Sequence, residues 1–309
     1  MHTFTIRRQQ LGLSIVELMV GVAIGLAILT GLALIYSQNS KVSANLERNS
    51  RHLESGRYAM QALSADLRLA GYLGEYYPNS GAPTLPADPC TTAIANLRND
   101  FLVHVQGYND SDGGLSCLSD YAGGDVIVIR RAATCTAANP LEAGCDALVD
   151  GQPYLQVSGC STDGLPAYAI SGNALAFRLE NSSAGLSMKK IGCSTTASAR
   201  RLHTYIYYIA ANNIAGDGIP TLKRWELGAS NNPQPIAEGI ENLQITYGID
   251  SDANGIADSY SDAPADITDW QSVVSVKFSV TSRSSASSNP RRHQFTSSVA
   301  LENPAGRRQ

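Results

Sequence analysis

The strongest pattern in the chain is an apolar stretch from Leu13 to Tyr36, interrupted only by Ser14, Glu17 and Thr30. As a helix, this stretch is about 36 Å long, which is sufficient to cross a bilayer with some tilt. The pattern therefore predicts a membrane-spanning helix over residues 13–36.

The sequence becomes polar after residue 36 but keeps an apolar stripe. Leu46, Leu53, Met60 and Leu67 recur every seven residues, and the pattern is not interrupted before Gly71. A coiled coil is the alternative, but consistent flanking charges are missing. We therefore expect a single helix from residue 13 to residue 70, whose second half buries one face on a globular domain.

Strand patterns dominate the last third of the chain. Earlier, between residues 75 and 200, only Asp125–Arg130 is a clear strand, and we expect an irregular, disulfide-tied insert with short strands there. A long helix followed by a run of strands predicts the α+β class, with an antiparallel sheet packed on the helix. The expected strands are Arg201–Ile209, Thr221–Leu227, Ile236–Tyr247, Val273–Thr281 and Gln294–Leu301.

Composition and charge narrow the function classes. The chain is 43% hydrophobic and 16% charged, which is typical of a folded protein, and its net charge is −4. Arg7 and Arg8 precede the apolar stretch and place the N-terminus in the cytoplasm. No basic stripe follows, so no nucleic-acid partner is indicated. No H-E-x-x-H, G-x-S-x-G or P-loop motif occurs, and we expect no enzymatic activity.

The six cysteines form no C-x-x-C pair and have no neighbouring histidine cluster. This pattern favours disulfides outside the cytosol over a zinc site, with free buried thiols as the alternative. Pairing between neighbours is the favoured arrangement, although the other pairings stay open. It joins Cys90 to Cys117, Cys135 to Cys145, and Cys160 to Cys193.

Glu17 is the anomaly of the apolar stretch, because a carboxylate in a membrane is costly unless it has a partner. A secretory signal peptide would have a shorter apolar core and a small-x-small cleavage site, and a plain anchor leaves Glu17 unexplained. The segment from Gly12 to Glu17, GLSIVE, resembles the class III signal of type IV prepilins and type II secretion pseudopilins.

That resemblance implies processing. A prepilin peptidase would cut after Gly12 on the cytoplasmic side, and Leu13 would become the N-methylated first residue, in place of the usual Phe. Glu17 would then be the fifth mature residue. Its carboxylate could pair with the new ammonium of Leu13, or with that of a neighbouring subunit, and so set the register between subunits. Gly21 and Gly25 form a G-x-x-x-G motif that allows close helix approach.

The C-terminal part has a second resemblance. The segment TLKRWELGASNNPQPIAEGIENLQITYGIDSDANGIADSY resembles PilW-type minor pilins, which implies a type IV pilin-like fold. It also implies a structural role in priming pilus assembly, at or near the pilus tip. The implied partners are other minor pilins, the major pilin and, for the insert, a tip adhesin. The residues that carry the resemblance are Leu222, Arg224, Gly239, Ile240, Glu241, Leu243, Gln244, Tyr247 and Gly248.

Two other functions stay open, a minor pseudopilin of type II secretion and a membrane-anchored periplasmic enzyme or binding protein. The expected organisation is a leader (1–12), a membrane and assembly helix (13–36), its amphipathic continuation (37–74) and a β-rich domain (75–309). The protein is then expected to cross the inner membrane once before assembly, and to lie afterwards in the periplasm and the extracellular pilus.

One loop has the spacing of a calcium site. Oxygen ligands at positions 1, 3, 5 and 9, with glycine at position 6, match the first part of a calcium-binding loop. Position 12 is serine rather than the glutamate of an EF-hand, so the next residue or water would complete the shell. An acidic surface turn is the alternative. The candidate calcium ligands are Asp250, Asp252, Asn254, the carbonyl of Ile256, Asp258 and Asp262.

Overall fold

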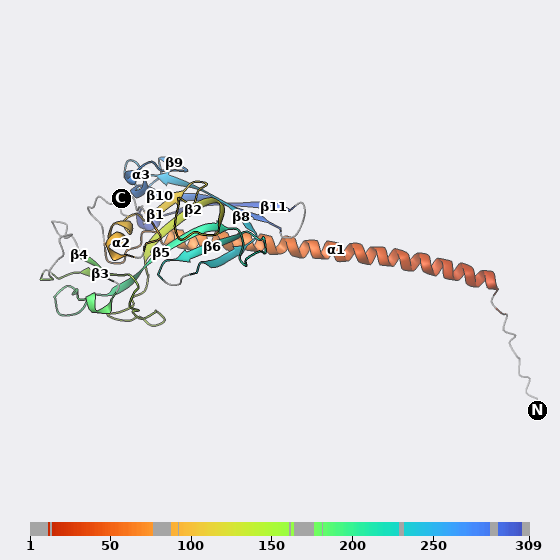
Figure 1. Cartoon of the computed structure of the whole chain (residues 1–309), viewed down its shortest axis with the longest axis horizontal. Helices are drawn as coiled ribbons and strands as arrows, with labels where there is room; N and C mark the ends of the chain where they lie inside the picture. The colour runs from red at the N-terminus through yellow and green to blue at the C-terminus, as the bar shows by residue number, and fades with distance from the viewer. Residues whose placement is uncertain are drawn as a thin grey trace, which may run out of the picture. The chain divides into compact units, whose positions relative to one another are not determined.

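The structure is a computed structural model that describes residues 12, 14–76, 88–91, 93–160, 162–163, 176–180, 182–228, 232–284 and 290–304 (Figure 1). The chain divides into two compact units, Met1–Arg51 and His52–Gln309. Helix α1, Ile15–Arg68, contributes residues to both units.

The long N-terminal helix is confirmed, with slightly tighter bounds than the sequence predicts. α1 begins at Ile15 and ends at Arg68, and Leu13 lies outside the described residues. Gly71 and Gly74 follow with φ angles of 70° and 60°, a conformation that glycine adopts without strain at the end of a helix. The helix is long and apolar enough to cross a membrane.

The apolar stripe is only partly buried. Leu63 and Leu67 are fully buried and Leu53 is half-buried, but Val42 and Leu46 are 56% and 64% exposed. The burial expected for the second half of the helix therefore begins only after Leu46. In the described part of the first unit α1 is the only element, so that unit has no sheet to cover these side chains.

The larger sheet has seven strands in antiparallel pairing. Its main path runs β1-β2-β5-β3-β4, and β6 and β7 extend from β5. β5 is the central strand, because it pairs with β2, β3 and β6 along its length. The strands are β1 (Val105–Tyr108), β2 (Tyr121–Ala132), β3 (Tyr154–Ser158), β4 (Ala176–Glu180), β5 (Ala199–Ala210), β6 (Thr221–Glu226) and β7 (Gln234–Glu238).

The smaller sheet has four antiparallel strands in the order β11-β10-β8-β9. Short helices lie outside the sheets: α2 (Ile94–Asp100), α3 (Ile267–Gln271) and the single-turn η1 (Ser183–Gly185). The strands of this sheet are β8 (Ile240–Ile249), β9 (Ser259–Ser261), β10 (Val273–Arg283) and β11 (Arg292–Ala300).

Two sequence expectations need correction. The region between residues 75 and 200, expected to be an irregular insert with short strands, is more regular, because it supplies β1 to β4 of the larger sheet. The single strand expected over Ile236–Tyr247 is two strands, β7 and β8, which belong to different sheets. The break falls at Gly239, whose φ of 77° is a left-handed conformation that few other residues adopt.

One core joins the two sheets to α1. Leu63 and Leu67 of the helix pack in the same apolar cluster as Ile127 of β2, Leu243 of β8 and Phe278 of β10. The alternation of apolar and polar residues along β10 explains this placement, since every second side chain faces the core. Burial of this cluster fixes the second half of α1 on the sheets.

The three disulfides join the neighbouring cysteines that the sequence analysis favours. No cysteine is free in the described parts of the chain, which include all six. The prediction of a disulfide-tied region is thus confirmed. The pairs are Cys90–Cys117, Cys135–Cys145 and Cys160–Cys193.

Candidate functional site

The predicted processing and assembly residues lie at the start of α1. Gly12 precedes the helix, and Leu13 falls outside the described residues. Glu17 lies in the first turn and is exposed, where unpaired backbone N–H groups and the helix dipole favour a negative charge. Its carboxylate forms no hydrogen bond or ion pair with any residue that the structure describes. Glu17 is thus available to a group from outside these residues.

The small residues of the apolar segment leave open surface on the helix. A Cβ added at Gly21, Gly25 or Gly31 would meet no described atom within 4 Å outside the helix itself. Gly21 is exposed, and Gly25 and Gly31 are half-buried. Such positions allow the backbone of a second helix to approach closely.

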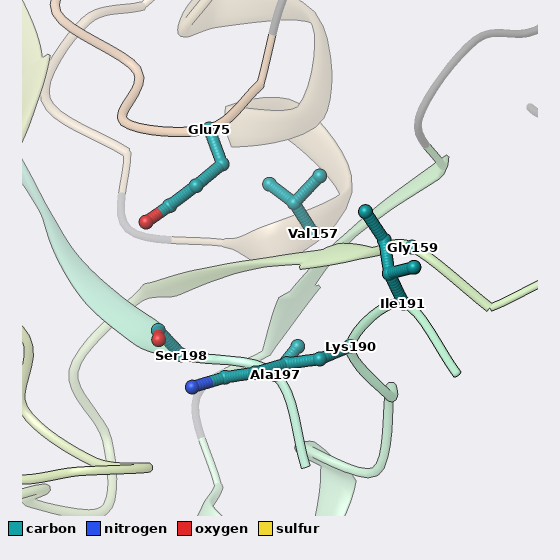
Figure 2. A pocket seen from close by; sticks show the side chains of 7 residues that line it. All are labelled: Glu75, Val157, Gly159, Lys190, Ile191, Ala197 and Ser198. Atoms are coloured by element: carbon teal, nitrogen blue, oxygen red, sulfur yellow. The ribbon is translucent and has the colours of Figure 1, made fainter. Parts of the chain in front are cut away.

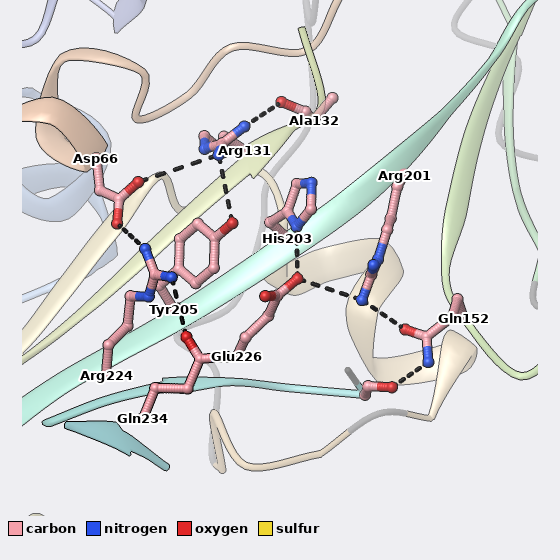
Figure 3. Close-up of polar contacts among 11 residues, drawn as sticks. Asp66, Arg131, Ala132, Gln152, Arg201, His203, Tyr205, Arg224, Glu226 and Gln234 are labelled. Carbon is pink, nitrogen blue, oxygen red and sulfur yellow. Dashed lines mark hydrogen bonds and ion pairs between the residues drawn. The ribbon is translucent and has the colours of Figure 1, made fainter. Parts of the chain in front are cut away.

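The other end of α1 is fixed to the larger sheet through Asp66, which is only 7% exposed (Figure 3). Its carboxylate accepts hydrogen bonds from the Tyr207 hydroxyl at 2.5 Å and from Arg224 at 3.1 Å. The guanidinium of Arg131 lies 4.0 Å away. Donors from β5, β6 and β2 therefore converge on one helix residue.

The aromatic ring of Tyr205 supports the same arrangement (Figure 3). The guanidinium of Arg224 lies 4.7 Å from the ring centroid and that of Arg131 lies 5.3 Å from it, both within cation–π range. Burial, together with the charge of Asp66, raises the pKa of Tyr207, so its hydroxyl remains a donor. A buried carboxylate with charge-assisted partners holds a defined position, which sets the register of α1 on the sheet.

The sequence contains a signal for this contact that belongs to no motif. Asp66 interrupts the apolar face between Leu63 and Leu67, where a charge needs a partner. Arg224 occupies the Leu-x-Arg core that contributes to the resemblance with PilW-type minor pilins. Only the fold shows that these two residues meet.

A second polar cluster ties β5 to β6 beside the first (Figure 3). Glu226 forms an ion pair with Arg201 at 3.2 Å and lies 2.9 Å from Nδ1 of His203. Burial lowers the pKa of His203, which favours the neutral ring. Gln152 accepts from Arg201 at 3.1 Å and donates to the carbonyl of Gly228. These contacts connect the start of β3 to the end of β6.

A close approach between α1 and β11 fixes the helix from the side of the smaller sheet. Gly56 is buried against the ring of Phe295, and a Cβ at this position would overlap the ring. Nearby, His52 Nδ1 lies 3.3 Å from the hydroxyl of Ser282. Glycine is thus required at residue 56 for close packing rather than for a turn.

The candidate calcium loop brings together part of the predicted ligand set. Carboxylate oxygens of Asp250, Asp252 and Asp258 lie within 4.8 Å of one another. Asn254 donates backbone and side-chain hydrogen bonds to Asp252, and its Oδ1 accepts from the Ile256 N–H. The loop therefore curls as an ion-binding turn would, although the same bonds also occur in a plain acidic turn.

Asp262 does not join these carboxylates. Its side chain accepts a hydrogen bond from Thr246 at 2.7 Å. Among the described residues, the group of nearby carboxylates contains Asp250, Asp252 and Asp258 but not Asp262. Backbone N–H groups donate to both oxygens of Asp250, and those of Ser251 and Asp252 donate to Asp258. A hard cation would complete its shell with water or backbone carbonyls.

Comparison with known families gives one match. Residues 206–302 match the family of type IV pilus-assembly protein W. The match runs from the second half of β5 to just past the end of β11, less than half of the chain's length, and includes Tyr207, Arg224 and Phe295. It indicates a role in type IV pilus assembly. Searches of curated proteins and of solved structures find no match.

The match also bears on location. The apolar helix α1 could span a membrane, and the pilus family suggests a place in the cell envelope. Tyr207 and Arg224, which donate to Asp66, and Phe295, which lies against Gly56, are in the matched segment, whereas Arg131 is outside it.

Proposed function

We propose that this protein is a minor pilin, a non-catalytic structural component that primes type IV pilus assembly at or near the pilus tip. One observation carries the proposal. A single helix has Glu17 at its apolar end, and near its other end Asp66 is bound to Tyr207 and Arg224 of the pilus-family segment.

Cleavage after Gly12 makes this helix competent for assembly. It creates an ammonium group on Leu13, one helical turn before Glu17. A carboxylate in hydrocarbon is costly without a partner, so Glu17 pairs with this ammonium or with that of a neighbouring subunit. The open surface at Gly21 and Gly25 lets the neighbouring helix approach.

The partners follow from this pathway. The protein first crosses the inner membrane with its N-terminus in the cytoplasm, where prepilin peptidase acts. It then joins other minor pilins and the major pilin through parallel helices. The disulfide-bonded second unit faces the periplasm and later the exterior, and contacts other minor pilins or a tip adhesin. Disulfides persist in such oxidising compartments.

The test is to replace Glu17 with alanine in cells and to score piliation. Glu17→Ala is expected to leave the amount of protein in the inner membrane unchanged, but to abolish its recovery in sheared filaments and to reduce piliation. Glu47→Ala is the matched control, because Glu47 is an exposed acid of the same helix that pairs only with Arg51 among the described residues. It should behave as the wild type.

Normal amounts of the Glu17→Ala protein in sheared filaments would contradict the proposal. Loss of type II secretion with intact piliation would instead identify a pseudopilin.

A further inference from the structure

A pocket of about 440 Å³ lies in the second unit between the turn after α1, the end of β3 and the segment before β5. Its size is within the range of small-ligand sites. In Figure 2 aliphatic side chains form its walls, whereas one carboxylate, one ammonium and one hydroxyl lie toward one end. The lining residues are Glu75, Val157, Gly159, Lys190, Ile191, Ala197 and Ser198.

The acidic group of the pocket is already neutralised. Glu75 accepts from Arg200 Nε at 3.1 Å and from its Nη2 at 2.9 Å, a two-point ion pair. These hydrogen bonds lower the pKa of Glu75, so it stays ionised. The remaining nitrogen of Arg200 donates to the carbonyls of Thr134 at 2.6 Å and Ala133 at 3.3 Å. Neither side chain has a charge left for a ligand.

Lys190 differs from Glu75 and Arg200 in its contacts. Its ammonium forms no hydrogen bond or ion pair within the described parts of the chain, and its side chain is exposed. It lies near enough to contribute to the lowered pKa of Glu75, yet farther than an ion pair. Among the described residues at the polar end of the pocket, Lys190 therefore has the one uncompensated positive charge (Figure 2). The hydroxyl of Ser198 lies at the same end and donates to the carbonyl of Asn139 at 3.2 Å.

The aliphatic wall is held in place before any ligand arrives. Gly159 N–H donates to the carbonyl of Lys189 at 2.9 Å, and a Cβ on Gly159 would lie 2.8 Å from the side chain of Ile191. The disulfide Cys160–Cys193 closes the same loop. Ile191 is nevertheless 86% exposed. A fixed loop that presents an uncovered aliphatic side chain loses little entropy on binding.

We propose that this pocket binds an aliphatic group that ends in a carboxylate. The aliphatic body contacts Val157, Ile191 and Ala197, and the carboxylate pairs with Lys190. An amine is repelled by Lys190, and an uncharged group leaves that ammonium unpaired. Either a free short-chain acid or the C-terminal residue of a polypeptide has this chemistry. The inference does not depend on the proposed role in the pilus.

The test uses the full chain in detergent micelles, with carbon-labelled isoleucine and valine methyl groups followed by NMR. Isovalerate is titrated at neutral pH and compared with two analogues of similar shape, uncharged isovaleramide and cationic isoamylamine. We expect saturable shifts of the Ile191 and Val157 methyl signals with isovalerate. The amide should bind about tenfold more weakly, because it lacks the charge-assisted contact, and the amine should not bind.

Two variants complete the test. Lys190→Gln is expected to bind isovalerate about tenfold more weakly and to lose the preference for acid over amide. Lys189→Gln is the matched control, because the Lys189 ammonium donates to Thr196 and does not line the pocket. The proposal fails if isovalerate does not saturate the Ile191 signal, if amide or amine binds as well as the acid, or if Lys190→Gln binds unchanged.

Acetyl-glycyl-leucine and its C-terminal amide separate the two sources. Tighter binding of the free-carboxylate peptide than of isovalerate supports a polypeptide terminus as the ligand. Tighter binding of isovalerate supports a small free acid.

Discussion

Asp66 is the helix residue that supplies the buried polar contacts between α1 and the larger sheet. Asp66→Ala would leave the Tyr207 hydroxyl and the guanidinium of Arg224 without their shared acceptor. Removing one partner of a buried ion pair typically lowers the free energy of unfolding by about 3 kcal/mol. Chemical denaturation of the full chain in detergent measures this loss.

Gln61→Ala is the control for that variant. Gln61 is an exposed residue of the same helix, and its replacement should change the free energy of unfolding by less than about 0.5 kcal/mol. A loss of less than about 1 kcal/mol for Asp66→Ala would show that the ion pair does not hold the helix.

The loop at Asp250–Asp258 gives a second prediction at the scale of single residues. If it binds calcium, the ion stabilises the folded chain by about 1.4 kcal/mol at ten times the dissociation constant. We expect the melting temperature in detergent to rise with calcium, and Asp252→Ala to abolish the rise. Asp146→Ala, at an exposed loop aspartate elsewhere, should retain it. An unchanged melting temperature at millimolar calcium would identify the loop as an acidic surface turn.

Individual residues differ in how far the sequence predicts their roles. Glu17 is conspicuous because a charge interrupts an apolar run, and the cysteines are conspicuous because their number is even. The role of Asp66 cannot be recognised in this way, because its partners lie about 140 and 160 residues later in the chain. Asp262 is conspicuous by its spacing, but only the fold shows that its carboxylate accepts a hydrogen bond from Thr246.

Among the elements, the packing of α1 on β11 depends on the absence of a side chain at Gly56. Gly56→Ala gains about 1 kcal/mol of helix propensity but forces a methyl group into the ring of Phe295, at a cost of about 1–3 kcal/mol. We expect net destabilisation in the same denaturation experiment.

A second substitution tests whether overlap with the Phe295 ring causes this destabilisation. Combining Gly56→Ala with Phe295→Leu should recover part of the loss, because the smaller side chain makes room. Gly31→Ala, where no described atom outside the helix lies near the added Cβ, should not destabilise the protein. A more stable Gly56→Ala variant would contradict the close approach.

Long periodic elements are predictable from this sequence, and short or divided ones are not. α1 has an extended apolar pattern, and β5, β6, β10 and β11 have strong strand signals, so their positions are confirmed. The split between β7 and β8 occurs at Gly239, which the sequence shows only as a glycine within an apolar run. Short strands such as β1 and β3 become recognisable only through their pairing with β2 and β5.

At the scale of the whole molecule, one helix serves two different environments. The large apolar side chains from Ile15 to Tyr36 are exposed, whereas Ala59, Leu63 and Leu67 pack against the sheets. A domain that stayed anchored in the membrane would need only the exposed apolar segment. The combination with Glu17 fits a helix that leaves the membrane for a filament, where a neighbouring chain supplies the missing partners.

This account requires that the ammonium of Leu13 be created by proteolysis. The most direct measurement is mass spectrometry of the mature N-terminus, on protein isolated from the inner membrane and from sheared filaments. We predict a chain that begins at N-methylated Leu13 in both fractions. A chain that retains Met1 to Gly12, or one that begins after Ser37, would contradict the proposed assembly mechanism.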